Sequence, residues 1–447
     1  MSSVMLLGGL AVLAAALLVA GLRWPVLLVL GVLFTMSLDH LGRLGLGFLT
    51  ANNLLKSATV AAVLLRLVLG GERIRLPAML LHFVPFLAVA GLASFYSPEY
   101  VVAFNSWMRL VFIWVFTLII ANVLRGEREL KLVVVVMAVV LATISVLAVV
   151  QASQAFSEGL LAIRRLGQAY SVGVRASATF FNPNKMAVHL GGMSILVFAG
   201  LPSIRRRWFR LFCFGSVLAG LLAILVSLSR SGFLMVGVAA LGFLLSRRHR
   251  RHALALILLG LLAVTVILTA TPYRDPLLDR FGSFGSLGDD SSGQARTSLL
   301  ITGLYVFGDG PNALWGTGYK GYTRAMQSHL YPLMSHDAYY HTGIRNGHNV
   351  WIAILAELGV LGMLAILLFF ATLYREFARL HRSRLSELQR CLLIGLVIYV
   401  SAKLVDFNLN PEFEENMFWY ALGILGALSL SAANASTDAL PHDRDYQ

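Results

Sequence analysis

Apolar residues along the chain gather into windows of about twenty residues, the length that an α-helix needs to cross a bilayer. The windows fall near residues 4–21, 25–38, 46–69, 77–95, 104–124, 131–152, 185–202, 209–228, 231–246, 253–270, 350–373, 391–405 and 416–433. The windows at 25–38 and 231–246 are short, so the pattern predicts 12–13 transmembrane helices. The expected fold class is an all-α polytopic membrane protein.

Charge indicates which connections face the cytoplasm. The odd-numbered connections carry 20 Lys and Arg residues, whereas the short even-numbered ones carry almost none, with Arg43 in one of them. Because Lys and Arg hold loops in the cytoplasm, we expect the even-numbered connections outside. The net charge of +14 is therefore mainly a topology signal. Basic stretches interleaved with aromatic residues are missing, so nucleic acid is not an expected partner.

Composition agrees with this reading and limits the chemistry. Charged residues make up 13% of the chain, against about 25% in soluble domains. Cys213 and Cys391 lie inside apolar windows, so neither a disulfide framework nor a thiolate metal site is expected. The first apolar run has no basic residue before it, which favours a retained helix over a cleaved signal peptide.

The predicted organisation has four parts. Residues 1–270 carry ten transmembrane helices and a short outer loop at 153–184, and residues 350–433 complete the bundle. Residues 271–349 form one large outer loop with short helices, in which 282–294 is flexible and 295–307 is an amphipathic helix at the interface. Residues 434–447 are a disordered tail.

Several basic residues on the outer side are not explained as cytoplasmic anchors. Arg230 lies in the turn SLSRSG (227–232), either as a snorkelling residue at the interface or as an anion contact inside the bundle. Arg175 opens RASATFFNPNKMAVHL (175–190), in which Asn182 is expected to cap a helix that starts at Pro183. A helix start and Arg guanidinium groups together suit a diphosphate.

A histidine and a glutamate stand out in RNGHNVWIAILAELGVLG (345–362). His348 lies near the membrane surface among arginines, which favour its neutral form, so it is either a structural residue or a general base. Glu357 follows about 13.5 Å further along the helix, too far for a dyad. We interpret Glu357 as a buried polar group bonded to a neighbouring helix.

A metal site is an alternative function for the residues just before the apolar window at 350–373. His336, Asp337, His341 and His348 are potential zinc ligands, but their spacing fits no standard motif, so no metal is expected. Serine-nucleophile, phosphate-loop and HExxH motifs are missing from the sequence.

Three segments resemble the O-antigen ligase and polymerase family of membrane glycosyltransferases, which have GT-C type architecture. They are RASATFFNPNKMAVHL, SLSRSGFLMV (227–236), and the stretch from Arg296 through PNALWGTGYKGY (311–322) to GHNVWIAILAELGVLG (347–362). They occur in the family's order, and the resemblance covers residues 170–365. Ligases of this family commonly have twelve spans and a cytoplasmic N-terminus, whereas thirteen windows place the N-terminus outside.

The resemblance implies transfer of glycan from undecaprenyl diphosphate to an acceptor hydroxyl on the periplasmic face of the inner membrane. Arg175, Arg230 and Arg296 would contact the donor diphosphate, and His348 would be the general base of an inverting reaction without cofactor or metal. The supporting residues are Asn182, Asn184, Asn349 and Lys320. The expected partners are the lipid-linked glycan, membrane lipids, and lipid A-core or another glycan acceptor.

The sequence does not determine the chemical identity of the acceptor. The large loop before His348 favours a ligase acting on lipid A-core over a polymerase or an O-oligosaccharyltransferase. A non-enzymatic lipid or glycan transporter is the more distant alternative. It would use charges inside spans, and Lys56, Arg109 and Lys403 are the ones that lie within windows. The sequence shows no internal repeat of the transporter kind.

Overall fold

The computed structural model describes residues 16–38, 50–70, 73–157, 175–271, 273–282, 291–308, 312–325, 349–410 and 412–437. These ranges form helices and the turns that join them, and no β-strand occurs within them. Ten helical segments among them are long and apolar enough to cross a membrane. The prediction of an all-α polytopic membrane protein is therefore confirmed.

Twelve of the predicted windows coincide with helices, and residues 16–23 at the end of the first window are also helical. The long segments are α3 (Ala51–Gly70), α4 (Ala78–Leu81) with α5 (Val84–Phe95), α6 (Tyr100–Val123), α7 (Glu127–Ser157), α9 (Pro183–Gly200), α10 (Arg207–Ser227), α12 (Arg250–Ala270), α18 (Val350–His381), α19 (Glu387–Asp406) and α20 (Asn416–Thr437). The two short windows are α2 (Pro25–Thr35) and α11 (Arg230–Leu245).

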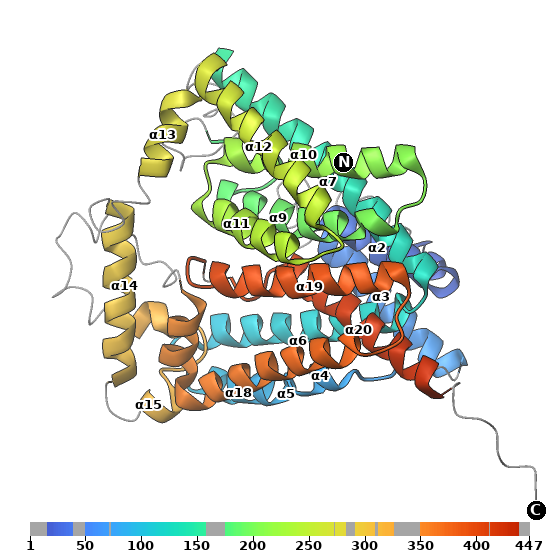
Figure 1. The fold of residues 1–447 in the computed structure, drawn as a ribbon. Helices are drawn as coiled ribbons and strands as arrows, with labels where there is room; N and C mark the ends of the chain where they lie inside the picture. The colour runs from blue at the N-terminus through green and yellow to red at the C-terminus, as the bar shows by residue number, and fades with distance from the viewer. Residues whose placement is uncertain are drawn as a thin grey trace, which may run out of the picture.

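The helices pack around α9, α19 and α20, which hold the most buried part of the bundle. Helix α20 lies against α6, and α10 lies against α7 and α9 (Figure 1). Small residues allow these close approaches: a Cβ added at Gly423 would meet Ile120, and one at Gly220 would meet Leu141. Helix α12 is mostly exposed at the edge of the bundle.

The predicted large loop carries three helices within its described residues, α13 (Arg274–Gly282), α14 (Ser291–Gly308) and α15 (Asn312–Trp315). Helix α14 runs across the direction of α18 and α6 rather than alongside them (Figure 1). It begins at Ser291, inside the stretch predicted to be flexible. Its inner face buries Leu299 and Val306, whereas Leu304 and Tyr305 on the outside are exposed. The outer face is therefore apolar rather than polar, as suits contact with lipid.

Helix α20 continues to Thr437, past the predicted start of the tail at residue 434. No Gly or Pro occurs between Ser431 and Thr437 to end it earlier. The rest of the predicted tail lies outside the described residues.

Candidate active site

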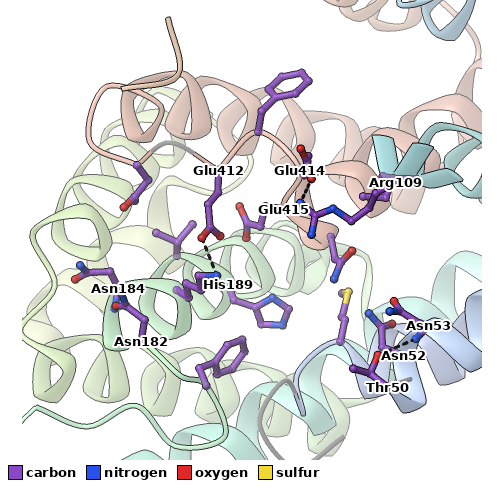
Figure 2. A pocket seen from close by; sticks show the side chains of 18 of the residues that line it. Thr50, Asn52, Asn53, Arg109, Asn182, Asn184, His189, Glu412, Glu414 and Glu415 are labelled. Atoms are coloured by element: carbon purple, nitrogen blue, oxygen red, sulfur yellow. Dashed lines mark hydrogen bonds and ion pairs between the residues drawn. The ribbon is translucent and has the colours of Figure 1, made fainter. Parts of the chain in front are cut away.

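A polar cavity of about 810 Å³ lies where several helices end near one another. It is lined by the end of α2, the starts of α3, α9 and α20, part of α6, the end of α19, and residues of the 316–323 and 410–416 connections. Figure 2 shows its acidic side with Glu412, Glu414 and Glu415, its amide side with Asn182 and Asn184, and a third group of Thr50, Asn52 and Asn53. Charged side chains around a cavity among helices of membrane-spanning length cost free energy, so such residues indicate a functional site.

Three helices direct their N-terminal ends at this cavity. Asn182 caps α9 as predicted, since its side chain accepts a hydrogen bond from the amide of Asn184 at 2.8 Å. The Thr50 hydroxyl accepts from the amide of Asn53 at 3.1 Å at the start of α3. Helix α20 begins at Asn416, another lining residue. Helix starts carry partial positive charge, so the cavity favours an anion.

The acidic side is held in place by a buried aromatic residue. Phe413 packs among aromatic rings of the bundle, with ring centroids 5.6 Å from Trp419 and 5.7 Å from Phe407. Its carbonyl also accepts a hydrogen bond from the Trp419 indole at 3.0 Å. Because Phe413 anchors the connection between α19 and α20, the carboxylates on either side of it are presented to the cavity.

Each of these carboxylates meets a cation from elsewhere in the chain. Lys185 pairs with Glu412 at 2.7 Å, Lys403 pairs with Glu415 at 2.6 Å, and Arg109 pairs with Glu414 (Figure 2). Burial favours the neutral form of Glu414, but the charges of Lys320 and Arg109 outweigh it and hold its pKa below the ordinary value. Burial instead raises the pKa of Glu415, in spite of Lys403.

Lys320 reaches the cavity from a glycine-rich turn, residues 316–321. Its ammonium lies 3.2 Å from Glu414, whose carboxylate also accepts from the Tyr319 hydroxyl at 3.1 Å. Lys320 itself has a positive φ of 56°, a conformation that non-glycine residues adopt only when their surroundings enforce it. The conformation of the turn therefore directs the Lys320 side chain into the cavity.

The same turn packs into a break in α18. Gly359 has a φ of 61°, so the helix is interrupted there, inside a window that is apolar apart from Glu357. The amides of Thr317 and Gly318 bond the carbonyls of Ala356 and Glu357 just before the break, at 2.9 and 3.0 Å. Carbonyls freed by the interruption are thus satisfied by the turn.

Glu357 lies at this break and is buried, as predicted, but its partner differs from the prediction. Its carboxyl faces the backbone amides of Lys320 and Tyr322 rather than a neighbouring helix. The interruption at Gly359 admits the turn beside α18, and amides of a turn are strong donors to a carboxylate.

Substituting Gly316 is expected to disrupt this junction. Gly316 has a φ of 77°, and a Cβ there would lie 2.2 Å from the Glu357 backbone. Gly316→Ala should lower the free energy of unfolding by about 1–3 kcal/mol from backbone strain alone. Gly260→Ala in α12 is the matched control, because nothing lies within 4 Å of its added Cβ. Thermal unfolding of both variants in detergent tests this, and equal stabilities would contradict it.

Arg175 and the turn that holds Arg230 are joined next to the amide side of the cavity. Arg175 donates to the Ser227 carbonyl at 2.9 Å and to the Asn184 side chain at 2.7 Å. This joins the segment at 175–190 to the turn between α10 and α11. Arg230 is the first residue of α11 and is 4% exposed, so it is buried in the bundle rather than snorkelling. Its neighbour Ser231 accepts from Asn410, which lines the cavity.

The other predicted site residues lie in α14, at the start of α18, or outside the described residues. Arg296 lies in α14, and His348 lies outside the described residues, as do the other potential zinc ligands at 336, 337 and 341. Asn349 caps α18, accepting from the amides of Trp351 and Ile352 at 2.9 and 3.1 Å. Whether Arg296 and His348 meet Arg175 and Arg230 therefore stays a prediction.

Several lining residues were not predicted to belong to the site. They are the four acidic residues of the 406–416 connection, His189 of α9, and the cations Lys56, Arg109, Lys185 and Lys403. His189 is buried and shares a hydrogen bond of 2.8 Å with Ser37. The signal in the sequence was the run EFEEN in a short outer connection, where carboxylates have no topological role.

Residues 214–367 match the protein family described as O-antigen ligase. The matched range contains the Arg230 turn, Arg296, the glycine-rich turn and the first part of α18. A comparison with curated proteins finds no significant match.

Proposed function

Because residues 214–367 match the family described as O-antigen ligase, we propose that this chain transfers glycan from an undecaprenyl-diphosphate-linked donor to an acceptor hydroxyl. The family implies a membrane glycosyltransferase-like enzyme, and ten helices of membrane-spanning length agree with a multi-pass protein. The proposal adds the donor, the periplasmic side of the inner membrane, the GT-C type of architecture and an inverting mechanism without metal.

The observation that carries the proposal is the convergence of two motif segments on one cavity. Arg175 bonds both the end of α10 and Asn184 at the start of α9. Arg230 begins the next helix, beside the residue that contacts Asn410. Two guanidinium groups that adjoin residues lining a polar cavity, together with a capped helix start, would provide the donors that a diphosphate requires.

The reaction follows from these groups and His348. The acceptor oxygen attacks the anomeric carbon from the face opposite the diphosphate, so the new glycosidic bond forms as the bond to the diphosphate breaks. His348 takes the proton of the acceptor hydroxyl. Undecaprenyl diphosphate leaves with the bonding electron pair, and the arginines stabilise the charge that develops on it.

We favour lipid A-core as the acceptor, since one large loop precedes His348, as in ligases of this family. A polymerase or an O-oligosaccharyltransferase would use the same donor and base. A transporter of lipid or glycan gains one supporting observation, because Lys56, Arg109 and Lys403, all within spans, line the cavity. Charged residues around a shared cavity are also what a transport pathway requires.

Transfer in detergent distinguishes these functions. Purified protein is mixed with undecaprenyl-diphosphate-linked glycan and lipid A-core, and the products are separated by mass. A glycan joined to lipid A-core supports a ligase, and a lengthened lipid-linked glycan supports a polymerase. If neither product forms while the protein moves the donor across sealed vesicles, the enzymatic proposal fails.

Lysine substitutions test the arginines in the same assay. Arg175→Lys and Arg230→Lys keep the charge but lose the paired geometry that matches phosphate oxygens. We expect each lysine variant to reduce the rate of transfer nearly as much as the corresponding alanine variant. Arg296→Lys should reduce it to the same extent. Arg324→Lys is the control, because Arg324 pairs with Glu99 at an exposed position. Wild-type turnover in all three lysine variants would place diphosphate recognition elsewhere.

A further inference from the structure

One cation of the cavity lacks a carboxylate among the described residues. Glu412 is paired with Lys185, Glu414 with Arg109 and Lys320, and both Glu415 and Asp406 with Lys403. These pairs use every carboxylate that lines the cavity. Lys56 of α3 lines it too, and its polar contact is the amide oxygen of Asn416 at 2.5 Å.

The burial of Lys56 makes this an unusual arrangement. Lys56 is 4% exposed, comparable to Lys403 at 1%. A buried ammonium without a counter-ion costs several kcal/mol, and one amide oxygen accepts only one of its three donors. The ring of Phe116, 5.8 Å away, offers a weak additional contact. Among the described residues, no carboxylate balances this charge, and an anion in the cavity would do so.

The surroundings of Lys56 favour that anion. Its partner Asn416 begins α20, and the start of α3 lies less than two turns before Lys56. Partial positive charge from both helix starts adds to the ammonium. This side of the cavity is formed by α3 and α20, whereas Arg175 contacts Asn184 at the start of α9 and Arg230 begins α11. The two groups therefore serve different parts of the cavity.

We propose that Lys56, supported by Asn416, is an anion-binding subsite for a phosphate group of a glycolipid substrate. This subsite adds a second substrate contact to the proposed transfer function, and the identity of its ligand rests on that function. The phosphate belongs either to the lipid-linked donor or to a phosphorylated acceptor. A charge-assisted contact of this kind contributes about 1.5–3 kcal/mol, which corresponds to roughly 10- to 100-fold in affinity.

Binding is tested with inorganic pyrophosphate and with undecaprenyl diphosphate in detergent, read as concentration-dependent shifts of the melting temperature. We expect Lys56→Met to weaken the binding of at least one probe about 10- to 100-fold. Lys185→Met is the matched control, since it removes the same charge from a cavity lysine that is paired and half-exposed. Lys56→Arg should recover part of the affinity.

Stability without ligand gives a second readout. Deleting an unbalanced buried charge should leave the melting temperature of Lys56→Met unchanged or higher. Equal probe affinities in the wild-type protein and Lys56→Met, or no shift by either probe in the wild-type protein, would overturn the proposal.

The transfer assay separates the two sources of the phosphate. A higher KM for the lipid-linked donor in Lys56→Met assigns the subsite to the donor, and a higher KM for phosphorylated lipid A-core assigns it to the acceptor. Unchanged KM values for both count against the subsite but leave the transfer function intact. If the wild-type protein forms no product yet binds the probes through Lys56, the transfer function fails and the subsite stands.

Discussion

Replacing His348 with alanine is expected to reduce glycan transfer by about two to four orders of magnitude, the usual contribution of a general base. Without the imidazole, the acceptor hydroxyl has no group to take its proton as its oxygen attacks the anomeric carbon. The protein should remain folded, because the adjacent cap of α18 is supplied by the Asn349 side chain. Product formation in detergent and a melting curve measure both effects.

The neighbouring histidine provides the control for this experiment. His341→Ala removes an imidazole from the same stretch, residues 335–348, and should keep transfer close to wild type. If His336→Ala, His341→Ala and His348→Ala all abolish transfer and a chelator does the same, the residues form a metal site. Full activity of His348→Ala, with loss of activity in His189→Ala, would move the base to the cavity-lining His189.

Replacing Lys403 with methionine is expected to cause the largest loss of stability among the cavity lysines. Its ammonium lies 2.6 Å from Asp406 and 2.6 Å from Glu415, and it is almost completely buried. Methionine would leave two buried carboxylates without their cation, and breaking a buried pair in this way costs about 3–5 kcal/mol. Unfolding in detergent should show a correspondingly lower melting temperature.

Lys185→Met serves as the comparison, because its pair with Glu412 is about half exposed on both sides. Exposed pairs contribute about 0–1 kcal/mol. A second comparison adds Asp406→Asn and Glu415→Gln to Lys403→Met, which removes the stranded charges and should restore part of the stability. Equal melting temperatures for Lys403→Met and Lys185→Met would show that the buried pairs do not hold this end of the bundle together.

The membrane fold could be predicted because its signals are local. A window of about twenty apolar residues must be helical in a bilayer, whatever its neighbours are. Twelve of the windows coincide with helices, and the caps at Asn182 and the turn at 227–232 also depend on a few adjacent residues. The sequence does not predict the break at Gly359, because its window is apolar apart from Glu357, and a glycine inside such a window is compatible with an unbroken span.

The candidate site could be predicted only in part. Local motifs singled out Arg175, Asn184 and Lys320, and the structure connects each of them to the cavity. The acidic connection at 412–415 is not singled out by the sequence, since Glu412 and Glu414 pair with cations more than 90 residues distant along the chain. The places of His348 and the Arg296 side chain relative to that cavity remain predictions.

Hydropathy, the distribution of Lys and Arg, and capping patterns thus predicted the membrane-spanning segments and their orientation, and three motif segments gave the resemblance to the O-antigen ligase family. These properties depend on the bilayer and on residues that are near neighbours in the sequence, so the sequence alone is enough to predict them. Which cations meet a carboxylate among the described residues depends largely on how the helices pack, because Arg109, Lys185 and Lys320 pair with carboxylates that are distant along the chain. Lys403 meets Asp406 within its own helix and Glu415 in the following connection, whereas the contact between Lys56 and the amide oxygen of Asn416 arises only because the packing brings α3 to the start of α20.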